Sequence, residues 1–257
     1  MLERLYAAYN NRGEASPDPV EFLYRYEDPL DREIVALFAS CLAYGRVAVI
    51  HRSVTWVLER FSSPRDDILR AHRSKATCLC EGFRHRFTSS DELAGLVGSI
   101  RDALQRYGSL RACFLDGLDP SDTTVVRALQ SFVTTLNPTG SFTSLLPLPA
   151  KGSACKRLHL FLRWLVRHDA VDPGGWESIS AARLIIPLDA HMFRLGRRMG
   201  LTTRSCATLA TAREITEGFR AFRPDDPVRY DFALTRVGMR GGATEEALVD
   251  TWRAARA

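Results

Sequence analysis

The sequence has 257 residues, which is long enough to bury a core as one large domain or as two small ones. Its content of 46% hydrophobic and 25% charged residues is ordinary for a soluble globular protein, and no apolar run approaches the length of a membrane span. We therefore expect a cytoplasmic protein that does not enter a membrane. The formal net charge of +5 favours a polyanionic partner such as nucleic acid without requiring one.

The six cysteines are scattered along the chain and form no metal-binding pattern. Only Cys78 and Cys80 lie close together, and no second close pair completes a zinc site. The four-cysteine cluster of an iron–sulfur centre is also absent. We expect reduced and mostly buried thiols, and no metal bound through cysteine.

The hydrophobic periodicity is helical along nearly the whole chain. Apolar residues fall on one helical face in the segments 34–42, 50–61, 93–107, 125–136, 155–165 and 230–237. We expect N-caps at Asp31, Asp189 and Asp226, the last of them followed by proline at the first helical position. Because no segment alternates convincingly between apolar and polar residues, the sequence predicts an all-α fold.

Lysine is rare in this chain, and one lysine stands at the start of a predicted helix. Of the 35 lysine and arginine residues, only Lys75, Lys151 and Lys156 are lysines. A lysine is needed where a primary amine acts as a nucleophile, or where arginine's planar fork cannot replace a compact ammonium. Lys156 follows the small-residue turn Gly152–Cys155, in the first turn of its helix, and we take it as a candidate nucleophile.

Asp189 begins another predicted helix, within the segment 186–191. An anion is stabilised at a helix N-terminus, so this carboxylate is expected to stay ionised. Capping alone accounts for an aspartate in this position. Together with Lys156, however, it suggests an amine nucleophile and a carboxylate that stabilises positive charge or accepts a proton.

Several segments, taken in order along the chain, resemble the helix-hairpin-helix DNA glycosylases of the endonuclease III superfamily. The segment 186–194 (IPLDAHMFR) resembles that family's VDTHIFR-like segment, and the segment 152–156 (GSACK) resembles its hairpin that ends in the catalytic lysine. Residues 33–61 and 226–238 are similar to its first two core helices and to a late helix. The long spacing between Lys156 and Asp189 and the missing iron–sulfur cysteines are most similar to the archaeal 8-oxoguanine DNA glycosylase type.

This resemblance implies two helical domains that flank a cleft and contain a degenerate helix-hairpin-helix motif without an iron–sulfur cluster. Residues 30–168 would form a helical barrel domain with the hairpin and the catalytic lysine. Residues 1–29 together with 169–257 would form a second helical domain that carries the aspartate.

The resemblance also implies an activity in base-excision DNA repair, as a combined DNA glycosylase and AP lyase. A damaged base in double-stranded DNA, with 8-oxoguanine the leading candidate, would be flipped out of the stack. Lys156 would attack C1′ and expel the base through a Schiff base, while Asp189 would stabilise the developing positive charge. We expect a monomer associated with the nucleoid.

The residues expected to contact DNA are Lys151, Gly152, Ser153, Ala154, Tyr44, Arg46, His191 and Arg194. The backbone N–H groups of residues 152–154 would hold a phosphate, and backbone carbonyls nearby would hold a K⁺ or Na⁺ ion; no other cofactor is expected. Tyr44 is the candidate wedge because the family's intercalating glutamine is absent. Trp176 and Phe193 are candidates to stack on the extruded base.

Two other functions remain open from the sequence. The first is a DNA-binding module without catalysis, in which Lys156→Arg would leave DNA affinity unchanged. The second is an all-helical metal phosphohydrolase that uses His168 and Asp169, with further ligands among His51, His72 and His191. Adjacent residues on a helix point about 100° apart, which makes the second function the less favoured one.

Overall fold

A computed structural model describes residues 1–240 and 243–254, and in these residues the regular secondary structure is helical apart from one small two-stranded sheet. The predicted all-α class is therefore confirmed. None of the helices in this part of the chain combines the length and the apolar character that crossing a bilayer requires.

The first half of the chain folds into α1 (Leu2–Tyr9), α2 (Arg12–Ala15), the 3-10 helix η1 (Pro19–Arg25), α3 (Pro29–Cys41), α4 (Val47–Leu58), α5 (Pro64–Arg70), α6 (Arg73–Cys80), the strands β1 (Arg84–His85) and β2 (Thr88–Ser89), and α7 (Ser90–Tyr107). The second half contains α8 (Leu110–Asp116), α9 (Val126–Leu136), η2 (Pro149–Lys151), α10 (Lys156–Val166), η3 (Ala181–Arg183), α11 (Ala190–Arg198), α12 (Leu209–Arg220), α13 (Asp231–Arg240) and α14 (Ala243–Ala254). Every segment with predicted helical periodicity overlaps one of these helices.

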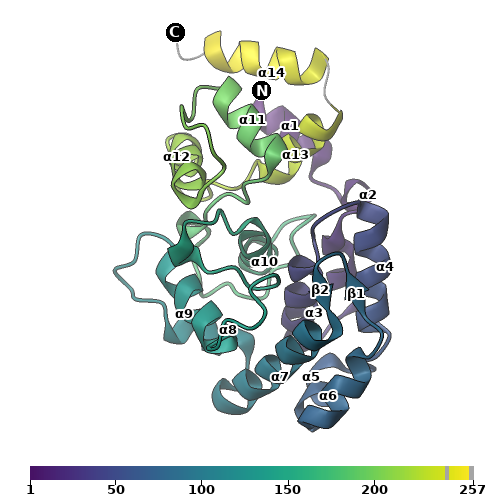
Figure 1. Cartoon of the computed structure of the whole chain (residues 1–257). Coiled ribbons are helices and arrows are strands. Elements are labelled where there is room, and N and C mark those ends of the chain that lie inside the picture. Colours follow the sequence, from purple (N-terminus) through teal and green to yellow (C-terminus); the bar gives the residue numbers. More distant parts are fainter. Residues whose placement is uncertain (241–242, 255–257) are drawn as a thin grey trace.

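The two ends of the chain lie in the same part of the molecule (Figure 1). Helix α1 packs against α13, and α11 to α14 gather around them, while α3 to α9 occupy the other part of the molecule. Glu3 of α1 joins this packing by pairing with Arg223 and Arg229 and accepting a hydrogen bond from Tyr230. The first residues of the chain are thereby held against a segment more than 200 residues away.

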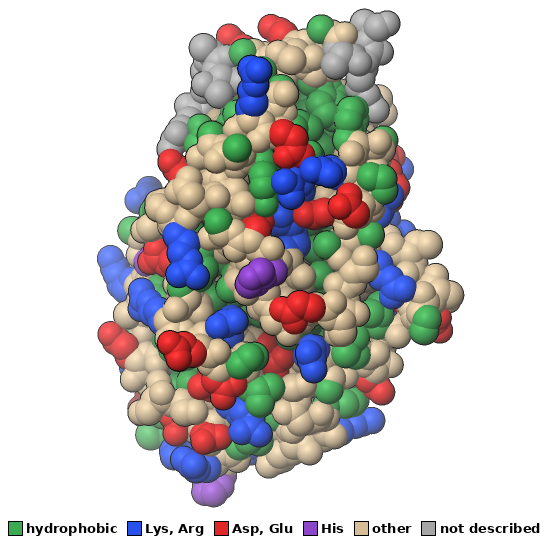
Figure 2. Space-filling view, turned by 180° about the vertical axis from the view of Figure 1, so that it is seen from behind, with side chains coloured by type: hydrophobic (Ala, Val, Ile, Leu, Met, Phe, Trp, Pro, Cys, Tyr) green, Lys and Arg blue, Asp and Glu red, His purple; other side chains and the backbone are tan. Residues whose placement is uncertain are grey.

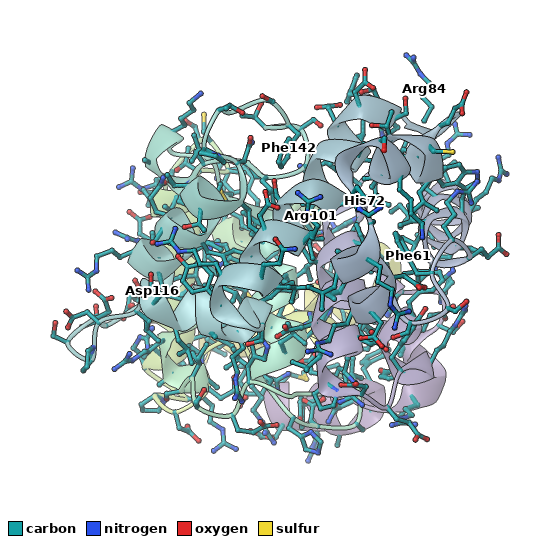
Figure 3. The ribbon with its side chains drawn as sticks, turned by 90° about the horizontal axis from the view of Figure 1, so that it is seen from below. Phe61, His72, Arg84, Arg101, Asp116 and Phe142 are labelled. Carbon is teal, nitrogen blue, oxygen red and sulfur yellow. The ribbon has the colours of Figure 1, made fainter. Side chains whose placement is uncertain are left out.

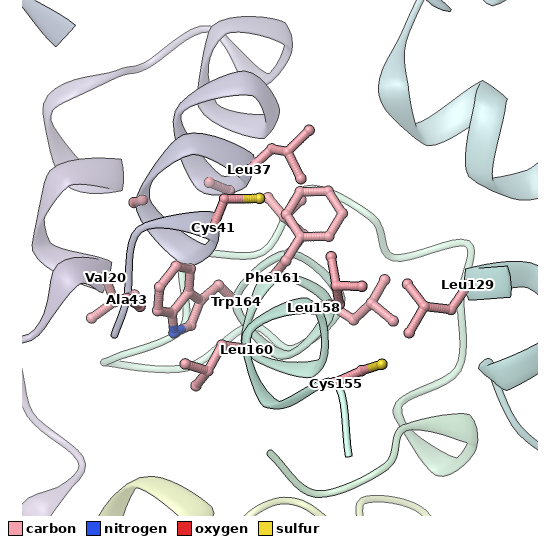
Figure 4. Close-up of a cluster of buried hydrophobic side chains, with 14 of the residues drawn as sticks. Val20, Leu37, Cys41, Ala43, Leu129, Cys155, Leu158, Leu160, Phe161 and Trp164 are labelled. Carbon is pink, nitrogen blue, oxygen red and sulfur yellow. The ribbon is translucent and has the colours of Figure 1, made fainter. Parts of the chain in front are cut away.

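Helix α10 lies at the centre of the fold and packs mainly against α3 (Figure 1). Every side chain from Leu158 to Val166 is buried, as expected for a helix that protein surrounds on all sides. Figure 4 shows Phe161 and Trp164 of this helix near Leu37 and Cys41 of α3. The core therefore fixes the helix whose first residue is Lys156.

Two predicted helix starts are wrong. Asp28 rather than Asp31 caps α3: its carboxylate accepts a hydrogen bond from Leu30 N, and Pro29 takes the first helical position. The Asp31 carboxylate instead accepts from Arg65 N at 2.7 Å, at the start of α5. The contact of Asp31 with α5 thus leaves Asp28 as the N-cap of α3.

The other error concerns α13, which begins at Asp231 rather than after Asp226. The Asp226 carboxylate accepts from Arg167 Nε at 3.0 Å, directly after the end of α10, instead of capping a helix. The β1–β2 hairpin was also missed, because two-residue strands are too short to show an alternating pattern.

A buried carboxylate joins three distant parts of the fold. Glu33 of α3 is 2% exposed and accepts hydrogen bonds from Leu110 N and Arg111 N at the start of α8. It accepts a third from Trp176 Nε1 at 3.0 Å. Burial raises the pKa of this carboxyl to about 6, against the opposing effect of the three donors.

We expect Glu33→Ala to lower the free energy of unfolding by about 3 kcal/mol, because three donors, two of them buried, would lose their acceptor. Urea unfolding followed by circular dichroism measures this change. Glu81→Ala, at an exposed glutamate, is the matched control and should change stability by less than about 0.5 kcal/mol. Equal effects of the two substitutions would contradict the assigned role of Glu33.

Candidate active site

A cavity of about 470 Å³ lies among α4, α10, α13 and the loops around residues 17–19 and 187–191. It brings together Lys156, Asp189, His191, Tyr44 and Ser153, which the sequence had suggested separately. Its apolar walls come from Pro17, Pro19, Val47, Ile50, Leu160 and Phe232. An apolar hollow with a few charged groups is the usual form of a small-ligand or catalytic site.

Lys156 is the first residue of α10, and the residue before it, Cys155, has the left-handed φ of 45°. This turn of the backbone starts the helix at the wall of the cavity. The side chain of Lys156 lines the cavity and is 34% exposed. A ligand in the cavity can therefore reach Nζ.

Asp189 faces Lys156 from the start of α11. Its Oδ1 accepts a hydrogen bond from Met192 N at 2.8 Å, which confirms the predicted N-cap. Its Oδ2 lies 4.0 Å from Lys156 Nζ. One oxygen thus fixes the carboxylate on its helix while the other faces the amine.

Asp231, which the sequence analysis missed, forms part of the cavity lining. It is 2% exposed, and its Oδ2 accepts from Arg163 Nη1, whereas its Oδ1 is buried without a hydrogen-bond partner among the described residues. Burial raises the pKa of Asp231 to about 6; Arg163 and, more weakly, Lys156 oppose this, and the charge of Asp189 adds to it. The cavity therefore holds two carboxyl groups in different environments.

One of the three backbone donors predicted to hold a phosphate, in the loop before Lys156, is used within the protein. Gly152 N donates to Pro149 O, and Gly152 O accepts from Leu209 N at 3.0 Å. Ser153 forms a β-bridge with Thr208, and its hydroxyl accepts from Cys155 N. The Gly152 N–H is therefore engaged within the protein, and its carbonyl is partly used where a K⁺ or Na⁺ ion was expected.

Lys151 and Gly152 are exposed, whereas Ala154 is buried. Arg46 is exposed and directly precedes α4. Arg194, another expected DNA contact, is bound to Glu245 at 2.8 Å and donates to Gly238 O, outside the cavity lining.

Neither aromatic residue expected to stack on a base lies in the cavity. Trp176 is 2% exposed and packs in the core against Phe161 and Phe114, with its indole N–H donated to Glu33. Phe193 borders a separate hollow formed mainly by arginines of α11. The aromatic side chains at the cavity are instead Tyr44 and Phe232.

Two residues of the metal phosphohydrolase alternative, His168 and Asp169, make contacts within the protein, whereas His191 lines the cavity. His168 Nδ1 is 2.9 Å from Pro173 O, and Asp169 pairs with Arg167 and accepts from Tyr6. Across residues 1–240 and 243–254, no three His, Cys, Asp or Glu side chains come together in a way that could hold a metal ion. The described part of the chain therefore shows no cluster of metal ligands that would support the metal phosphohydrolase alternative.

Residues 18–240 match the family model described as "Protein of unknown function (DUF2400)". The chain belongs to this family. No helix-hairpin-helix or glycosylase family model matches, so the resemblance to the endonuclease III superfamily is corrected. No curated protein and no solved structure matches the chain. The DUF2400 match contains Lys156, Asp189 and Asp231, so these site residues belong to the region that defines the family.

We expect substitutions of the two neighbouring charges to move the pKa of Asp231 in opposite directions. Asp189→Asn should lower it, because a nearby negative charge is removed; Lys156→Gln should raise it, because a positive charge that favours the carboxylate is lost. Titration of the Asp231 ¹³Cγ chemical shift by NMR measures both changes. Shifts in the same direction would show that the three groups do not share one electrostatic environment.

Proposed function

We propose that the protein is a DNA glycosylase and AP lyase that acts through a Schiff base on Lys156. The observation that carries the proposal is the 4.0 Å separation of Lys156 Nζ from Asp189 Oδ2 in a cavity that is open to solvent. An amine beside a fixed carboxylate is the arrangement required for attack on a carbon that gains positive charge. The volume of about 470 Å³ and the apolar walls suit one extruded nucleotide.

In the proposed reaction, Lys156 Nζ attacks C1′ of the extruded nucleotide with its lone pair. The bond from C1′ to the base breaks, and the base leaves with the bonding electrons and takes up a proton. Loss of a proton from nitrogen and opening of the sugar at O4′ give the imine. Removal of a C2′ proton then expels the 3′ phosphate, which cuts the strand.

Asp189 has two roles in this scheme. While the bond to the base breaks, its carboxylate stabilises the positive charge at C1′ and O4′. After the bond from Nζ to C1′ has formed, it accepts, through one water, the proton that the nitrogen loses, since the two atoms lie 4.0 Å apart. Its cap hydrogen bond to Met192 keeps it in place for both roles.

The net charge of +5 supports DNA as the polymer that carries the substrate. Figure 2 shows basic and acidic side chains interspersed over one face of the molecule rather than a large basic field. We therefore attribute DNA recognition to local contacts near the cavity, with Lys151 and Arg46 as exposed candidates. The choice of 8-oxoguanine depended on the corrected resemblance, so that base is one lesion to be compared with others.

We expect borohydride to trap a covalent adduct between the protein and a duplex that contains an abasic site. Lys156→Gln should reduce the adduct by about 100-fold or more, because the nucleophile is lost, and Asp189→Asn should slow its formation about 100-fold. Gel electrophoresis of the trapped complex measures both. Lys75→Gln is the matched control, since it removes an exposed lysine that does not line the cavity and should leave the adduct unchanged.

The same assay on duplexes with 8-oxoguanine and with other damaged bases identifies the lesion. Absence of an adduct on every duplex, with the protein folded and bound to DNA, would reject the lysine mechanism. In that case the non-catalytic DNA-binding module would become the better account, and Lys156→Arg should then bind DNA as tightly as the wild type.

A further inference from the structure

The β1–β2 hairpin carries a large apolar side chain into solvent. Its two strands pair Arg84 with Ser89 and His85 with Thr88, so Arg86 and Phe87 form the two-residue turn. Phe87 is 77% exposed, and Arg86 adopts a left-handed φ of 52°. A partner that covers this largely exposed ring would remove apolar surface from water, which is favourable.

The base of the hairpin is held firmly in the protein. His85 is buried, with Nδ1 2.8 Å from Ser53 Oγ and Nε2 3.1 Å from Tyr44 O. The Tyr44 hydroxyl donates to His85 O at 2.8 Å and lies at the same distance from Thr88 Oγ1. Phe87 therefore lies at the turn of a hairpin that several hydrogen bonds hold against Tyr44.

The hairpin turn is connected to the cavity by alternating guanidinium groups and aromatic rings. The Arg86 guanidinium lies 5.4 Å from the Phe87 ring and 5.8 Å from the Tyr44 ring. Arg157 lies 4.7 Å from the Tyr44 ring. Tyr44 and Arg157 line the cavity that contains Lys156. The exposed Phe87 is thus connected to the cavity wall through Arg86, which lies near both the Phe87 and the Tyr44 rings.

Two arginines of the hairpin accompany the exposed ring. Arg84 and Arg86 are both exposed, and Arg84 projects outward from the edge of the molecule (Figure 3). An aromatic ring flanked by arginines matches a nucleic acid, because the ring stacks on bases while the guanidinium groups contact phosphates. A hydrophobic protein partner would not require this charge.

We propose that Phe87 is the wedge that enters the base stack of duplex DNA and fills the gap left when a nucleotide moves into the cavity. The proposal rests on the nucleic-acid substrate of the proposed function, but not on its lysine chemistry. This proposal replaces the expectation that Tyr44 is the wedge. The Tyr44 hydroxyl donates a hydrogen bond to the hairpin, and its ring packs against Arg157, so Tyr44 instead supports the hairpin that carries Phe87.

The test is binding to a duplex that contains a tetrahydrofuran abasic analogue, which cannot form a Schiff base. A 2-aminopurine next to the analogue reports by fluorescence whether a side chain has entered the stack. We expect Phe87→Ala to weaken binding about 10-fold and to abolish the fluorescence change, since stacking on a base is worth about 1–3 kcal/mol. Phe87→Trp should retain both, because it keeps an aromatic ring at the turn.

Phe222→Ala is the control for loss of an exposed phenylalanine, because Phe222 borders α1 and α14 rather than the hairpin. It should leave affinity and fluorescence unchanged. Unchanged values for Phe87→Ala would overturn the wedge and leave the ring as a contact for a protein partner. A wedge effect without any borohydride adduct would support Phe87 while rejecting the lysine mechanism, and a protein that binds no duplex would overturn both proposals.

Discussion

The position of the candidate site depends on a buried network of charges on the central helix. Arg163 of α10 and Arg167, which directly follows this helix, are both almost fully buried, and both bind the carboxylate of Asp172, which has no exposed surface. Arg163 also binds Asp231, and Arg167 also binds Asp226. Breaking a buried pair of this kind typically costs about 3–5 kcal/mol, because an unpaired charge remains in the core. The network therefore allows one arrangement of α10 relative to α13.

This arrangement has a direct effect on the cavity. Lys156 and Arg163 are on the same helix, two turns apart, and Asp231 is bound to Arg163 while it lines the cavity with Lys156. The ion pair between Asp231 and Arg163 therefore both connects α13 to α10 and forms part of the candidate site. Burial raises the pKa of Asp231 because it disfavours the charged carboxylate. The ion pair with Arg163 offsets part of this unfavourable desolvation and holds the side chain in position.

The residues that could be predicted from the sequence are those whose role depends on local signals. Lys156 and Asp189 each stand at a helix start, and the rarity of lysine singled out the first of them. Asp226 has an equally good local signal as an N-cap, but the buried guanidinium of Arg167 binds it instead. Asp231 was not predicted, because its importance comes from Arg163, which is 68 positions away in the sequence.

The family resemblance failed for a related reason. Short helical segments with small residues before a lysine, or proline before an aspartate, arise wherever a helix needs a start. Their order along the chain suggested a common ancestor, whereas the family match identifies DUF2400. The hairpin with Phe87 could not be predicted for the opposite reason. Its two-residue strands show no periodicity, and they are held through His85 by Tyr44 and Ser53, which lie more than 30 residues away in the sequence.

The scarcity of lysine has a practical consequence for studying the cavity. With only Lys75, Lys151 and Lys156 in the chain, reductive methylation with ¹³C-formaldehyde would place isotopic probes at just three side-chain amines. Lys156 is sufficiently exposed for the reagent to reach it, and its methyl signals would then report on whatever enters the cavity. A chain of ordinary lysine content would give a crowded spectrum, so the arginine-rich composition makes this site unusually accessible to direct spectroscopic observation.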